Sequence, residues 1–150
     1  MNKTIPIILA VVMIGSAILY TIFSSTPEPP EDSCSQFVTV EEGPDRTPYE
    51  IHVACSYFEQ RTGRTADLTN VTVNLSRTPD CPSGVPACAH VLPFPPHIEV
   101  QSNTPKWKQY LHHEVWHVLL WRAEPWVHPD DHHLRMKELG LCKPHRLCGY

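Results

Sequence analysis

The sequence predicts an α+β domain with a small sheet, cross-linked by disulfides and placed behind an N-terminal apolar segment. Three observations predict this class. Residues 5–23 carry no charged side chain, all six cysteines follow that segment, and helix-like and strand-like patterns alternate from residue 47 onward. A chain of 150 residues suits one small domain, and residues 34–150 are the part available to it.

Residues 5–23 have the length and composition of a membrane-spanning helix. These 19 residues would cover about 28 Å, close to the hydrocarbon thickness of a bilayer. Lys3 precedes the segment and acidic residues follow it, so residues 1–4 are predicted to be cytoplasmic and the domain extracytoplasmic, either periplasmic or extracellular. A cleaved signal peptide and a secreted product are the alternative. Residues 24–33, rich in proline and acidic, are typical of an extended linker.

The cysteines predict an oxidising compartment. They are Cys34, Cys55, Cys81, Cys88, Cys142 and Cys148. An even number confined to the exported part indicates three disulfides, and short loops favour Cys81–Cys88 and Cys142–Cys148, which leaves Cys34–Cys55. A structural zinc site is the weaker alternative, because no C-x-x-C pair occurs.

The first half of the domain contains one predicted helix and two predicted strands. The helix covers residues 47–63, where apolar side chains recur at helical spacing and Gly63 ends the pattern. Alternating apolar and polar residues predict strands over 70–76 and 97–102, and the segment 78–96 between them, with many prolines, is predicted to be a loop. Glycosylation triplets begin at Asn70 and Asn74, which matters only in a eukaryotic secretory pathway.

Two helices are predicted to complete the domain. The first begins near Pro105, at a position that proline favours, and runs to about Ala123, before Pro125. The last begins near Asp130 and ends before Gly140. The predicted order is therefore helix, strand, loop, strand, helix, helix.

The penultimate helix carries His113, Glu114 and His117 in the order H-E-x-x-H. Residues four apart share one helix face, so both imidazoles can bind one ion. Zn²⁺ favours such nitrogen ligands and keeps a position open in catalytic sites. Glu114, rotated by about 100° along the helix, falls beside the ion, where a carboxylate can accept a proton from metal-bound water. The sequence thus predicts a zinc site with a catalytic Glu114. The alternative is a surface helix whose histidines are solvated and bind no metal.

The third zinc ligand must come from farther along the chain. The long metzincin motif fails, because Leu120 and Ala123 stand where its glycine and third histidine belong. The stretch HPDDHHLRMKELG resembles the segment that follows the active helix in SprT-like and related minimal zincins, which implies His128 as the third ligand. His132 and His133 are alternatives. Glu138 is another, because its spacing from His117 is similar to that in thermolysin-like enzymes. The remaining downstream candidates are Glu124, Asp130 and Asp131.

The chain resembles a minimal zincin metallopeptidase, specifically at residues 113–117 and as an architecture over 47–140. The resemblance implies a zinc hydrolase that cleaves a peptide or protein substrate by Glu114-assisted attack of zinc-bound water. It also implies that an edge strand before the active helix pairs with the substrate. Residues 97–102 occupy that position, with Glu99 facing the cleft.

Two other functions fit the same residues. One is a non-catalytic zinc-binding interaction module with the same fold, and the other is a zinc hydrolase of a non-peptide bond. Nucleic-acid binding has no support, because the net charge is −4 and the lysines and arginines are scattered.

Overall fold

The computed structural model describes residues 34–142. The predicted cytoplasmic N-terminus, membrane segment 5–23 and linker, like Cys148, lie outside this range. Among the helices of the described range, none combines the length and the apolar composition needed to cross a bilayer.

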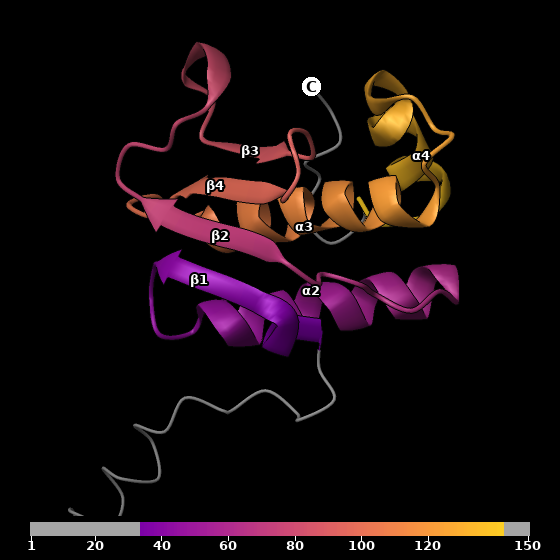
Figure 1. The fold of residues 1–150 in the computed structure, drawn as a ribbon, viewed down its shortest axis with the longest axis horizontal. Coiled ribbons are helices and arrows are strands. Elements are labelled where there is room, and N and C mark those ends of the chain that lie inside the picture. The colour runs from indigo at the N-terminus through magenta and orange to yellow at the C-terminus, as the bar shows by residue number, and fades with distance from the viewer. Residues whose placement is uncertain (1–33, 143–150) are drawn as a thin grey trace, which may run out of the picture.

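The described chain has the predicted α+β class (Figure 1). In chain order the elements are the 3-10 turn η1 (Cys34–Phe37), β1 (Val38–Glu42), α2 (Thr47–Thr62), β2 (Val71–Ser76), η2 (Pro82–Gly84), β3 (Ala87–His90), β4 (His97–Gln101), α3 (Trp107–Ala123), η3 (Pro129–Asp131) and α4 (His132–Glu138). The three predicted helices and two predicted strands are all confirmed. The last helix begins slightly later than expected, because a 3-10 turn precedes it.

The sheet contains four strands in the order β1-β2-β4-β3. The first three of these are mutually parallel, and β3 runs antiparallel to β4. Sequence patterns missed β1 and β3, and β3 lies inside the predicted loop 78–96. Since β4 pairs on both sides, the prediction that residues 97–102 form the edge strand is wrong. The edge strand on this side of the sheet is β3 instead.

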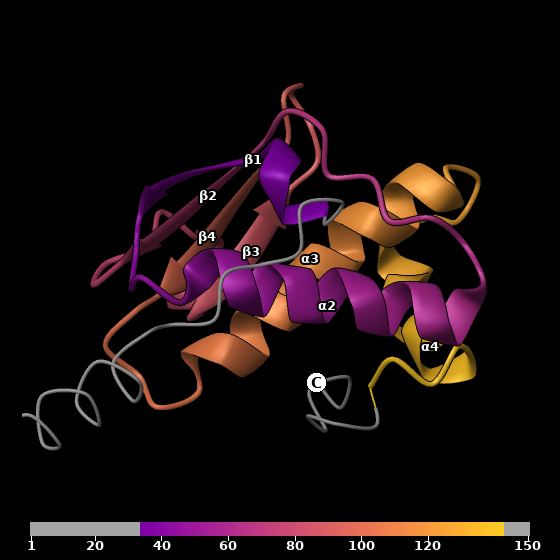
Figure 2. The ribbon, with the colours of Figure 1, turned by 90° about the horizontal axis from the view of Figure 1, so that it is seen from below.

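One face of the sheet is covered by α2 and α3, which lie side by side (Figure 2). The alternating residues of the inner strands point toward these helices and are buried, namely Val71, Val73, Leu75, Ile98 and Val100. Trp116 of α3 fixes the two helices together, because its indole nitrogen donates a 3.0 Å hydrogen bond to the backbone carbonyl of Ala54 in α2. Helix α3 is therefore anchored against both the sheet and a second helix.

The opposite face of the sheet is polar. Glu99 lies there, because side chains alternate along a strand and its neighbours Ile98 and Val100 face the core. Its carboxylate accepts hydrogen bonds of 3.1 and 3.2 Å from the side-chain amide of Asn74. The expectation that Glu99 faces the cleft is therefore wrong.

Two of the three predicted disulfides lie wholly within the described range, and both are confirmed. Cys34 is bonded to Cys55 in α2, and Cys81 is bonded to Cys88 in β3. The predicted third pair includes a residue outside the described range. The second bridge closes the loop before β3, and so holds the edge strand next to the site described below.

Candidate metal centre

Helix α3 presents its motif from a rigid, buried position. Leu111, Val115 and Leu119 have almost no exposed surface and pack into the core. His113 and Glu114 are also buried, although they point away from that core toward a cleft that they help to line. Helix α3 therefore has two different faces. Its apolar side chains pack into the core from one face, and its imidazoles line the cleft from the other.

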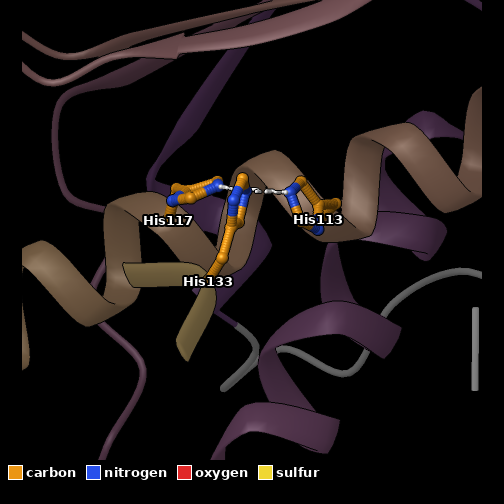
Figure 3. A group of neighbouring side chains, drawn as sticks. All are labelled: His113, His117 and His133. Carbon is orange, nitrogen blue, oxygen red and sulfur yellow. Dashed lines mark hydrogen bonds between the residues drawn. The ribbon is translucent and has the colours of Figure 1, made fainter. Parts of the chain in front are cut away.

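Three histidines converge at one point (Figure 3). The Nε2 atoms of His113 and His117 are 3.2 Å apart, and each lies 3.1 Å from Nε2 of His133. A tetrahedral zinc ion with bonds of about 2.0–2.1 Å places its nitrogen ligands about 3.3 Å apart. The triangle therefore has the size that one such ion requires, and these three side chains form a group that could hold a metal ion.

The third histidine of the triangle, His133, comes from α4 and is one of the predicted alternatives. The preferred candidate, His128, lies outside the triangle. His128 is 69% exposed at its side chain, and its Nδ1 accepts a hydrogen bond of 3.4 Å from the backbone N–H of Asp130. The turn Pro129–Asp131 separates it from α4. Because α4 starts at His132, its first turn faces α3 and brings His133 to the triangle, so the structure does not bring His128 to the cluster.

Two of the acidic candidates, Glu138 and Glu124, form ion pairs with arginine side chains instead. Glu138 accepts a 2.9 Å bond from the guanidinium of Arg135, on the outer side of α4. Glu124 has only 3% of its side chain exposed. It accepts bonds of 2.7 and 2.8 Å from Nε and Nη2 of Arg135 and a third contact of 2.8 Å from Arg64. This clamp joins the segments just after α2 and α3 to the middle of α4, and so holds the helix that carries His133.

We expect Glu124→Gln to reduce the free energy of unfolding by about 1–3 kcal/mol, because two partly exposed guanidinium groups lose a buried carboxylate. The hydrogen bonds from Arg135 lower the pKa of Glu124 below its usual 4.5. The stabilisation should therefore be present above pH 4.5 and be lost as the pH falls through the lowered pKa. Urea unfolding at several pH values checks this. A difference between variant and parent that stays constant down to pH 2 would contradict it.

Most of the clustered imidazoles are held neutral. Burial lowers the pKa of His117 well below 6.5, and the nearby His113, His133 and His132 lower it further. Burial also lowers the pKa of His132, and burial followed by the charge of Lys137 lowers that of His133. A neutral imidazole keeps a lone pair free, which is the form that binds metal ions.

Glu114 lies beside the triangle in contact with the edge strand. Burial raises the pKa of its carboxyl group from 4.5 to about 8, and a hydrogen bond from the backbone N–H of Ala89 acts in the opposite direction. A cation at the triangle would lower this pKa, since an opposite charge nearby favours the ionised form. The carboxyl group is thus placed where it can exchange a proton near neutral pH.

The register of β3 explains this hydrogen bond. Gln101 donates its backbone N–H to the carbonyl of Pro86 at 2.8 Å, so alternate pairs along the two antiparallel strands are hydrogen-bonded. Ala87 and Ala89 fall on the other pairs, and their backbone groups point away from β4 into the cleft. Nothing in the short sequence ACAH signals this edge, because it lacks the β-branched alternation typical of strands.

The cleft has a volume of about 470 Å³ and is bounded by β3, α3 and the start of α4. Its lining residues are Val85, Pro86, Ala87, Cys88, Ala89, Val91, Tyr110, His113, Glu114, His117, Pro129, His132 and His133. The walls are largely apolar, and the polar groups gather at the histidine triangle. In comparisons with protein-family models, curated proteins and solved structures, no match to this chain is found.

Proposed function

We propose that the protein is a zinc-dependent metallopeptidase that hydrolyses peptide bonds. The observation that carries the proposal is the triangle of Nε2 atoms from His113, His117 and His133 with the carboxyl group of Glu114 beside it, all opening on one cleft. This is the minimal-zincin reading of the sequence, with the third ligand reassigned from His128 to His133.

Zinc fits the donor set better than Mg²⁺ or Ca²⁺ does. Three imidazoles and no carboxylate in the triangle disfavour Mg²⁺ and Ca²⁺, which prefer oxygen ligands. Three histidine ligands with a fourth position left for water are a known catalytic zinc arrangement. When bound, the ion would polarise a carbonyl group and lower the pKa of a bound water toward about 7.

Glu114 would perform the proton transfers. Its carboxylate lies next to the triangle without belonging to it, so it can accept a proton from the attacking water and give that proton to the leaving amine. The N–H of Ala89 holds the carboxyl group in the cleft until substrate enters. Such an arrangement has no purpose in a site that only needs to hold a metal ion.

The edge strand supports a peptide as the substrate. The backbone groups of Ala87 and Ala89 point away from β4 along one wall of the cleft. An extended peptide that displaces Glu114 from the N–H of Ala89 can add to such an edge as a further strand. The disulfide at Cys88 holds this wall in place. A non-peptide substrate would make no use of a strand edge. Hydrolysis of a peptide bond is therefore favoured over hydrolysis of a non-peptide bond.

The proposed location is extracytoplasmic, with the domain tethered through residues 5–23. Support comes from the apolar composition of that segment and from the disulfides Cys34–Cys55 and Cys81–Cys88, since such bonds persist in oxidising compartments. The linker 24–33 would hold the cleft away from the bilayer.

The test uses the full chain purified in detergent with its disulfides intact. A strong zinc chelator should abolish cleavage of an unfolded generic protein such as reduced casein, and stoichiometric Zn²⁺ should restore it, whereas Mg²⁺ should not. Zinc that binds stoichiometrically without any cleavage would favour the non-catalytic module. Cleavage that persists after complete metal removal would rule out the proposed mechanism.

A further inference from the structure

One histidine of the cleft stands outside the triangle. His132 is only 2% exposed, and its Nδ1 lies 3.4 Å from Nδ1 of His117. The two ring centroids are 5.6 Å apart with an interplanar angle of 24°. Rings that are nearly parallel at this separation meet edge to edge, which is the geometry of a hydrogen bond in the ring plane and too distant for face-to-face stacking.

The two nitrogens of His117 face different partners. Its Nε2 points into the triangle, where a lone pair is needed to bind a cation. The proton of the neutral ring must then sit on Nδ1, which makes that atom the donor toward His132. Nδ1 of His132 consequently accepts this bond.

We propose that His132 is a positioning residue that fixes the tautomer and the ring orientation of the metal ligand His117. This inference rests on the proposed metal site. Ligating histidines are commonly held in this way through their second nitrogen, and loss of such a partner typically weakens metal binding about 10–100-fold. Here the partner is another imidazole instead of the usual carboxylate or carbonyl.

The helix geometry explains how two adjacent histidines take different roles. His132 and His133 are consecutive residues of α4, so their side chains leave the helix about 100° apart. His133 reaches the triangle, and His132 reaches the opposite side of the His117 ring. The Arg135–Glu124 contacts fix α4 against the end of α3, and therefore fix both histidines together.

The same geometry separates His132 from a fourth metal ligand. A fourth ligand would direct a ring nitrogen at the centre of the three Nε2 atoms, whereas His132 meets His117 at the opposite ring nitrogen. The position above the triangle thus stays open toward the cleft, as a catalytic site requires.

Two substitutions in the full chain separate a hydrogen-bonding role from a packing role. In His132→Asn the side-chain oxygen can occupy the place of Nδ1 and accept the bond, although much of the ring volume is lost. In His132→Phe the ring volume is kept and the acceptor is lost. Zn²⁺ affinity is measured by competition with a chelating dye, and the Co²⁺-loaded absorption spectrum reports the ligand geometry. His128→Asn is the matched control, because that exposed side chain contacts Asp130 and lies outside the cluster.

We expect His132→Phe to weaken Zn²⁺ binding about 10–100-fold and to change the Co²⁺ spectrum, while His132→Asn stays near the parent and the control is unchanged. Equal affinities in the two variants, or tighter binding by the Phe variant than by the Asn variant, would overturn the inference. The readout is metal affinity and needs no substrate. A protein that shows the expected ranking but cleaves nothing would therefore overturn the proposed peptidase activity and leave this inference intact.

Discussion

Replacing Glu114 by glutamine is expected to reduce the rate of peptide hydrolysis by about 10²–10⁴-fold, the usual contribution of a general acid–base group. Glutamine has nearly the same shape, and its carbonyl oxygen can still accept the hydrogen bond from Ala89. It cannot take a proton from water at neutral pH. Because Glu114 is not part of the histidine triangle, the variant should bind zinc as the parent does.

The measurement is kcat/KM on an internally quenched peptide, with the zinc content of each preparation determined alongside. Glu99→Gln is the matched control, because Glu99 lies on the opposite face of the sheet and its contact with Asn74 survives as an amide pair. We expect the control to keep full activity. Cleavage by the Glu114 variant at the rate of the parent, with zinc bound in both, would show that this carboxyl group transfers no proton in the reaction.

The sequence predicted the elements whose signals are local. The helices α2 and α3 follow from apolar spacing and from proline and glycine at their ends, and β2 and β4 follow from strict alternation. The edge strand β3 has no such signal. Its four residues become a strand through pairing with β4 and through the disulfide at Cys88, and both of these are contacts between separate segments. An interior strand was therefore mistaken for the edge.

The residues of the site also fall into those that local sequence spacing predicts and those that depend on the tertiary structure. His113, Glu114 and His117 could be placed from the sequence because a helix fixes the relation between residues four apart. The choice between His128 and His133 could not, since it depends on the turn Pro129–Asp131 and on the residue at which α4 begins. The Glu124 clamp, which links Arg64, Glu124 and Arg135 from three separate segments, is likewise a tertiary feature without a sequence motif.

Exchanging His133 for alanine should cost more metal affinity than any other change outside the H-E-x-x-H motif. The substitution removes one of three Nε2 donors, so we expect Zn²⁺ binding to weaken beyond the roughly 100-fold upper range for loss of an outer-shell partner. The exposed His128 belongs to the loop before α4, and its replacement by alanine should leave binding unchanged. This pair of variants distinguishes His133, the third ligand that the structure indicates, from His128, the third ligand that the sequence resemblance implied.

Both variants should be tested for zinc stoichiometry by elemental analysis and for affinity by chelator competition, after circular dichroism has shown that each keeps the parent spectrum. If α4 depended on the volume of the His133 side chain for its folding, His133→Gln would retain more of that volume than His133→Ala does. It should still lose the metal, because its amide is a poor zinc ligand. Loss of zinc in the His128 variant with retention in both His133 variants would return the third ligand to the loop. The loop between α3 and α4 would then have to refold when metal binds, since His128 now lies outside the cluster.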